Sequence, residues 1–318
     1  MSKALTSKKI IESAKRRAQI PTSQNTFKDE DFLALANEEL QLGLVPSVLQ
    51  LHEDYFLWQT EVPIQAGVSQ YTIPYRAIGN KLRNLFYQDT NGNLFEMTRI
   101  SEDDRGDYNA AYATNYFHAF RVKNNKIVLE PILSGSATGN LVFVFYIRAN
   151  DLVLDDEVGD ITGIDRTTGV ISVSSLPKKF NASTKYDFIQ NNSPHVHLGI
   201  DAQALSINTV QKSVTFNPDD IPDDLAVGDH LAFAQESKVP QVPTDLHVVL
   251  AHRLAARCLE AIGDTQGLTN ANIKLQEFEA KLTNVVDNRV EDAPIKVKNR
   301  HGLLRNGLVT RKYIIRGR

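Results

Sequence analysis

The spacing of the apolar residues changes twice along this chain, from helical to strand-like and back to helical. Near the amino terminus, Ile10, Ile11 and Ala14 recur three and four residues apart, as on an amphipathic helix. Between residues 65 and 150 the period falls to two, and after Pro240 it returns to 3.6. Helices from the two ends therefore enclose a β region, which predicts an α+β fold with a helix bundle built from both chain ends.

Two further helices are predicted before the β region. Thr26 and Asp29 have the spacing of a capping box, and the helix that they begin should end at Gly43. Pro46 is suited to the first position of the next helix, which should continue until it stops before Pro63.

The β region begins with short alternating runs that predict a small antiparallel sheet. Asn91-Gly92 is a strong hairpin signal, and Lys123-Asn124-Asn125 marks a second hairpin. The strands are expected at residues 69–73, 82–87, 94–97, 117–122, 126–129 and 141–147.

Residues 151–237 differ in composition from the rest of the chain. They contain 14 acidic and five basic side chains, a formal charge of −9, and short strand-like runs that alternate with turn residues. This pattern predicts an inserted all-β domain, a barrel or a sandwich. Its strands are expected at residues 169–173, 185–189, 206–210, 213–216 and 230–233.

Two helices are predicted after the insertion. The first contains Cys258 and is apolar on nearly all sides, which indicates the centre of the bundle, and Gly263 should cap it. The second carries Leu275 and Phe278 on one face and ends near Asn288. We therefore expect a helical body with a small β-sheet from residues 1–150 and 238–292, the inserted domain at 151–237, and an extended basic arm at 293–318.

Several classes of protein are excluded or disfavoured by the composition. The longest run of large apolar residues, 141–147, has seven members, whereas a membrane helix needs about 20. Residues 1–17 lack the apolar segment of a signal peptide, so we expect assembly in the cytoplasm. Cys258 is the only cysteine, which excludes an intrachain disulfide and a multi-cysteine zinc site.

No familiar catalytic or nucleotide-binding motif is present, and the sequence predicts neither an enzyme nor a cofactor. His195 and His197 would lie on one face of a strand, and a metal site there would need Asp201 or His230 to complete it. Exposure in a polar loop after Pro194 is the simpler interpretation, and no metal is expected. Cys258 is expected to be a buried apolar residue rather than a nucleophile.

Two acidic clusters are also interpreted as turns. Asp155, Asp156, Glu157 and Asp160 resemble a calcium loop in composition only, because the alternating ligand spacing is missing. A second cluster flanks Ile221-Pro222 and has ordinary turn chemistry. It consists of Asp219, Asp220, Asp223 and Asp224.

The carboxyl-terminal arm has a charge of +8 and no acidic residue, which favours an anionic partner. Residues 309–315 are strand-like, yet no other segment remains in the chain to pair with them. Addition of this segment to a sheet or groove of another subunit would satisfy its backbone and its apolar side chains. The alternative is a flexible, solubilising terminus.

Residues 10–21 and 27–47 resemble the head-to-tail adaptor proteins of short-tailed bacteriophages, also called connector or ring proteins. Residues 261–264, the helix that follows and residues 287–297 resemble the carboxyl-terminal half of the same family. The similarity covers about residues 8–150 and 238–305. The insertion departs from the simplest members, which have a short loop at that point.

The resemblance implies a virion protein at the head-tail junction that needs no catalysis. About twelve copies would form a ring around the DNA exit channel, seal and extend that channel, and offer a platform to tail proteins during assembly and DNA ejection. DNA would pass without specific recognition. The arm would bind the portal protein through Lys296, Lys298, Arg300, Arg305, Arg311, Lys312, Tyr313, Ile314, Ile315 and Arg316.

The acidic insertion would repel DNA, so we expect it to face outward, with Asp219, Asp220, Asp223 and Asp224 directed toward tail proteins. Two other functions stay open. A nucleic-acid-binding protein would use the basic tail on phosphates, although the acidic body and the lack of an aromatic series disfavour it. Residues 151–237 could instead bind carbohydrate or have an enzymatic activity. This function is disfavoured because the segment contains no recognisable catalytic pair.

Overall fold

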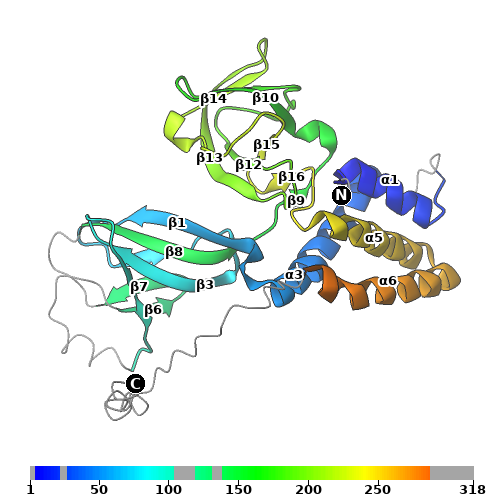
Figure 1. Ribbon diagram of the computed structural model, residues 1–318, viewed down its shortest axis with the longest axis horizontal. Helices are drawn as coiled ribbons and strands as arrows, with labels where there is room; N and C mark the ends of the chain where they lie inside the picture. Colours follow the sequence, from blue (N-terminus) through cyan, green and yellow to red (C-terminus); the bar gives the residue numbers. More distant parts are fainter. Residues whose placement is uncertain (1–3, 22–26, 104–118, 131–137, 287–318) are drawn as a thin grey trace, which may run out of the picture. The chain divides into compact units, whose positions relative to one another are not determined.

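The computed structural model describes residues 4–21, 27–103, 119–130 and 138–286. The fold is α+β, with helices from the two chain ends packed together, antiparallel sheets and an inserted β-barrel (Figure 1). In these ranges no helix is long and apolar enough to cross a membrane. The helices are α1 (Ser7–Arg17), α2 (Asp29–Glu38), α3 (Val45–Leu51), α5 (His247–Ile262) and α6 (Thr265–Val286).

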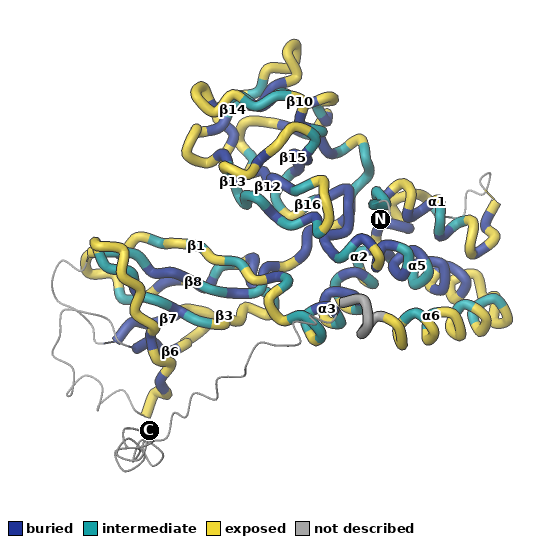
Figure 2. The backbone as a smooth tube through the Cα atoms, in the orientation of Figure 1, coloured by how far each residue is buried: buried dark blue, intermediate teal, exposed yellow. Residues whose placement is uncertain are grey.

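The prediction that the helix around Cys258 forms the centre of the bundle is confirmed. Helix α5 packs against α1, α2 and α6, and Figure 1 shows it between α1 and α6. Most of α5 is buried, as the dark tube in Figure 2 shows, and Cys258 is fully covered. Gly263 ends the helix in the left-handed conformation, with φ of 82°, which glycine adopts without steric cost.

The second and third predicted helices are in fact joined. A π-helix, η1 (Glu39–Leu44), connects α2 directly to α3, so Gly43 does not end the helix. The side chain of Arg253 lies over Gly43, where a larger residue would collide with it. At the start of α2, the carboxylate of Asp31 accepts a 2.8 Å hydrogen bond from the amide of Lys28, while Thr26 lies outside the described residues.

The predicted continuation of the third helix to Pro63 is wrong. Helix α3 ends at Leu51, a 3-10 turn η2 (Glu53–Phe56) follows, and residues 57–63 form strand β1. Strand β1 pairs antiparallel with β8 (Asn140–Ile147) along its whole length, from Leu57 opposite Tyr146 to Pro63 opposite Asn140. Pairing with a long apolar strand therefore outweighed a local pattern that was compatible with a helix.

The predicted small sheet is two four-stranded sheets. The first has the order β1 (Leu57–Pro63), β8 (Asn140–Ile147), β3 (Ala77–Gln88) and β4 (Leu94–Glu96), and the second β2 (Gln70–Thr72), β7 (Lys126–Glu130), β6 (Ala119–Lys123) and β5 (Thr98–Arg99). Both predicted hairpins are present, but β5 runs parallel to β6.

The insertion is a closed six-stranded barrel. Its strands follow the order β10 (Gly159–Asp165), β11 (Val170–Val173), β14 (Ser213–Phe216), β13 (His197–Asn208), β12 (Lys185–Ile189) and β15 (His230–Phe233). The strand expected at 206–210 is the end of the longer β13, and residues 209–212 form the following turn. At the base, β9 (Asp151–Leu152) pairs with β16 (Glu236–Ser237), so the two ends of the insertion are adjacent.

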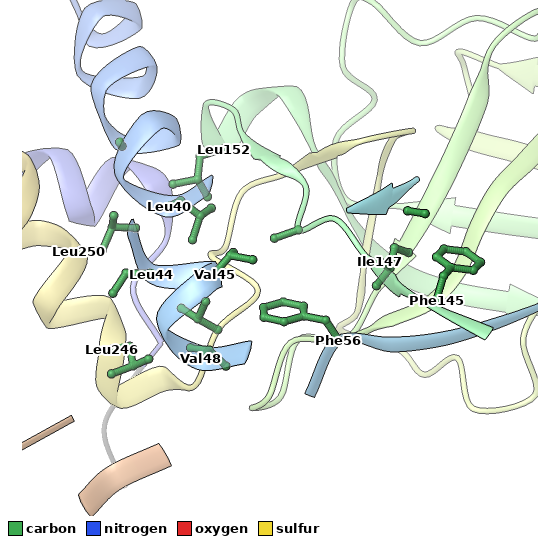
Figure 3. Packing of buried hydrophobic residues seen from close by; sticks show 14 of the residues in the cluster. Leu40, Leu44, Val45, Val48, Phe56, Phe145, Ile147, Leu152, Leu246 and Leu250 are labelled. Atoms are coloured by element: carbon green, nitrogen blue, oxygen red, sulfur yellow. The ribbon is translucent and has the colours of Figure 1, made fainter. Parts of the chain in front are cut away.

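Two large apolar cores and one small cluster, Val158, Ile189 and Ala232, follow from this organisation. The barrel has its own core, which includes Tyr186, Phe188 and Phe216. The helices and the two sheets share a second core. In Figure 3, Phe56 lies between the helical residues around Val48 and the strand residues around Ile147, so apolar packing continues from the bundle into the sheet.

Candidate interaction surfaces

The barrel meets the rest of the body through a buried polar network. Arg76, just before β3, forms an ion pair with Asp187 of β12, and both side chains are almost completely buried. Asn150, just before β9, donates to Asp187 at 2.8 Å and accepts from Arg76 at 3.1 Å. The backbone amides of Asp201 and Gln235 donate to the same carboxylate at 3.0 and 2.9 Å. Asp187 thus joins the barrel to the sheet by directional bonds.

The expectation that His195 and His197 are exposed in a polar loop is wrong. His195 is 1% exposed and His197 is 6% exposed, because both lie between the barrel and the body. His197 Nε2 lies 2.9 Å from Asn150 Oδ1, and its ring meets the ring of Trp58 edge-on. His195 packs against the ring of His247 at the start of α5.

These histidines do not form a metal site with their predicted partners. His230 Nδ1 lies 2.8 Å from a carboxylate oxygen of Asp160, and Asp201 accepts a hydrogen bond from Tyr75. Among the described residues, no group of three or more histidine, cysteine, aspartate or glutamate side chains is placed to hold a metal ion.

Burial keeps the junction histidines uncharged near neutral pH. Burial, with a smaller contribution from Arg76, lowers the pKa of His197 to about 3. Burial and the neighbouring His195 lower the pKa of His247 to about 4, and burial also lowers the pKa of His195. A charged imidazole at any of these positions would lack water and a carboxylate to compensate it. Burial likewise raises the pKa of the Cys258 thiol to about 11.

The first acidic cluster is only in part the solvated turn that was expected. Asp155 accepts hydrogen bonds from the hydroxyls of Thr6 and Ser7, at 2.8 and 2.9 Å, and so holds the first turn of α1. Asp160 pairs with His230 and Lys238, and these partners lower its pKa to about 2. The acidic residues at the base of the barrel therefore fasten it to the body.

The second cluster lies on what we call the acidic loop, residues 217–228. The 3-10 turn η4 (Pro218–Asp220) begins this loop. The Arg166 guanidinium, through Nη2, donates to three of its carbonyl oxygens, those of Pro222, Asp223 and Leu225, at 2.9–3.1 Å. The following side chains are all exposed and have no ion pair with a described residue: Asp219, Asp220, Asp223 and Asp224.

A second surface was not anticipated from the sequence. Leu42 on η1 and Tyr75 before β3 stand on the rim of a groove of about 450 Å³. Their exposed fractions are 81% and 52%, so two large side chains with apolar surface are open to solvent beside one concave site. We call it the Leu42 groove, and its apolar lining comprises Leu42, Val45, Pro46, Leu49, Tyr75 and Ile78.

The Leu42 groove also carries positive charge. Arg148 lies on its wall, is exposed, and has no hydrogen bond or ion pair from its guanidinium to a described residue. Arg76 also lines the groove and is 2% exposed, and its Nε and Nη1 atoms lack a partner among the described residues. Asp151 is the one carboxylate in the lining, and Gln41 donates to it at 3.2 Å.

The arm residues singled out in the sequence, from Lys296 to Arg316, lie outside the described residues. A scan against protein-family models gives no match, and a search of curated proteins gives none either.

The polar network at the base of the barrel left one signal in the sequence. Asp187 interrupts the apolar run Tyr186 to Ile189, and a carboxylate inside a buried strand requires a partner. Arg76 could not be named as that partner, because 111 residues separate the two. The Leu42 groove left no signal, since its lining is brought together by helix, sheet and linker.

Proposed function

We propose that this protein is a structural virion subunit that forms a ring between the portal and the tail of a short-tailed bacteriophage. The ring extends and seals the DNA channel and serves as a platform for tail proteins. The arm at 293–318 binds the portal, and DNA passes without sequence recognition. In this proposal the protein acts mechanically and needs neither catalysis nor a cofactor.

The observation that carries the proposal is the separation of a self-contained body from a basic arm. The chain divides into a unit Met1–Asp287 and a unit Asn288–Arg318. All residues of the described apolar cores belong to the first unit. The arm nevertheless carries apolar residues and a charge of +8, a combination suited to an anionic surface on another protein.

The proposal is tested by removing residues 296–318 and imaging the protein with a purified portal by negative stain. We expect the full chain to form rings that dock on the portal and the truncated chain to do neither. The melting temperature should change by less than about 2 °C, since the described cores keep all their residues. A large fall in melting temperature would show instead that the arm packs on its own body.

Binding of the portal through the arm also predicts how assembly depends on the portal. Contacts that form only with the portal stabilise the ring only when the portal is present. We therefore expect monomers or weak oligomers in dilute solution and a stable ring on the portal, as measured by light scattering. A tight ring in the absence of portal contradicts this expectation.

The alternative function is nucleic-acid binding through the same basic arm. It predicts affinity for duplex DNA without a portal, and a steep loss of that affinity between about 50 and 200 mM salt. Truncation at residue 296 would then remove DNA binding, and the full chain would show no interaction with the portal.

A further inference from the structure

The Leu42 groove has the properties of a protein docking site. It combines an apolar lining with an exposed arginine, Arg148, that no described residue pairs. Beneath them Arg76 is almost fully buried, with two nitrogen atoms unpartnered. Those two nitrogen atoms are themselves buried and the charge of Arg76 is compensated by Asp187, so the charge that a ligand meets is that of Arg148, which favours a ligand that carries carboxylates. The matching ligand is an apolar side chain flanked by carboxylates.

The chain itself carries a segment of that chemistry. The acidic loop presents four exposed aspartates, and three residues beyond Asp224 it presents Val227, which is 66% exposed. The Arg166 hydrogen bonds hold the middle of the loop, and Asp229 accepts from the amide of Ala226 at 2.8 Å next to Val227. A loop that is already ordered loses little conformational entropy when it docks.

The two surfaces do not meet within one copy. The acidic loop packs on β13 through its turn η4 and through Pro222, which lies against Gly199. The groove is formed by η1, α3, the start of β3 and the linker before β9. No hydrogen bond or ion pair among the described residues joins one to the other. A loop of this kind that fills the groove would therefore belong to a second copy.

We propose that the acidic loop of one copy docks in the Leu42 groove of the next, with Val227 on the apolar lining and the aspartates beside Arg148. The proposal rests on the ring function above and names its subunit contact. Two different surfaces are used, so the contact is head-to-tail, and such contacts generate rings when the rotation closes. An exposed ion pair contributes little free energy, so the contact selects the register of neighbours more than it provides affinity.

The first test is a disulfide between copies. Full-length Leu42→Cys and Val227→Cys proteins are mixed at high concentration and oxidised, and the linked peptides are identified by mass spectrometry. Cys258, the only native cysteine, is fully buried and does not compete. The control partner is Val210→Cys on the β13–β14 turn, because Val210 is 91% exposed and would react faster in random collisions.

We expect at least about tenfold more 42–227 than 42–210 linkage. Equal yields, or a dominant 42–42 linkage that indicates a symmetric dimer, overturn the proposal. Rings on the portal that contain no 42–227 linkage overturn this contact and leave the ring function standing. Linkage between copies that never form rings on a portal supports the contact and removes the ring function.

The second test uses charge. Arg148→Glu should lower the yield of the 42–227 linkage by at least about fivefold at low salt, whereas Arg148→Lys should keep most of it. Adding Asp223→Lys and Asp224→Lys to the Val227→Cys protein should restore the yield with Arg148→Glu. If these lysines leave the linkage with wild-type Arg148 unchanged but prevent attachment of tail components, the loop serves tail proteins and the proposal fails.

Discussion

The helices meet the sheets through an apolar junction, whereas the barrel meets the same body through a polar one. Phe56 lies between Val48 of the bundle and Ile147 of the sheet, and all three are buried. Between barrel and body lie Arg76 and Asp187, with Asn150 and the histidines around them. The free energy of an apolar contact depends on the area buried and changes little when the two surfaces shift slightly. A hydrogen bond, in contrast, requires a fixed direction between donor and acceptor. The buried polar bonds therefore restrict the orientation of the barrel on the body more than apolar packing alone would.

The sharpest way to break the polar junction is to remove one member of its buried ion pair. Asp187→Ala leaves the Arg76 charge buried without compensation, and we expect a loss of about 3–5 kcal/mol in the free energy of unfolding. Replacement of both residues, Arg76→Met with Asp187→Leu, should cost clearly less than the single change. Urea denaturation of the three proteins measures the difference, and a double variant as unstable as Asp187→Ala contradicts this account.

The apolar junction is broken by removing volume. Phe56→Ala should lower the free energy of unfolding by about 3–4 kcal/mol, since the ring lies between helix and sheet and leaves a cavity. Leu42→Ala is the matched control, because Leu42 is exposed and should change stability by less than about 0.5 kcal/mol. Similar losses in the two variants, measured by urea denaturation, would mean that Phe56 is not a core contact.

Acid should weaken the polar junction and spare the apolar one. The pKa values of His197 and His247 are about 3 and 4 in the folded protein, below the 6.5 of an unfolded chain. As the pH falls below 6.5, the histidines become protonated in the unfolded state but not in the folded state. The free energy of unfolding, which is highest above pH 6.5, therefore decreases. When the pH falls from 7 to 5, we expect the free energy of unfolding to decrease by about 2 kcal/mol for each of these histidines.

The measurement is the free energy of unfolding of the wild type and of His197→Gln across this range. The variant should lose less stability on acidification, even if it starts lower. Burial raises the pKa of Glu236, so acidification through its titration range adds to the stability of the folded protein rather than reducing it. The pKa of Asp160 is about 2, so this residue stays charged in the folded protein between pH 7 and 5. An equal pH dependence in both proteins contradicts the role of His197.

The smallest effect is expected where the barrel caps α1. Asp155→Ala removes the acceptor of the Thr6 and Ser7 hydroxyls, and a lost cap costs about 1 kcal/mol. Asp156→Ala is the control, because Asp156 is the exposed neighbour and makes no hydrogen bond or ion pair with a described residue. Hydrogen exchange should show faster opening of α1 in Asp155→Ala alone.

The local periodicity of the sequence determined the class of the fold. The helical stripes of α1 and α5, the two hairpins and the composition of residues 151–237 each follow from side-chain spacing and turn chemistry. The same local reasoning failed at residues 57–63, because a strand partner 77 to 89 residues away outweighed a pattern that also fits a helix.

The tertiary structure decided which residues of different helices and strands come into contact. Closure of six strands into a barrel rather than a sandwich, the burial of His195 and His197, and the Leu42 groove all depend on segments far apart in the chain. A sequence specifies which residues need a partner, as Asp187 does within an apolar strand. Which residue meets that need is set by packing, because burial removes water and leaves only the neighbours that the fold provides.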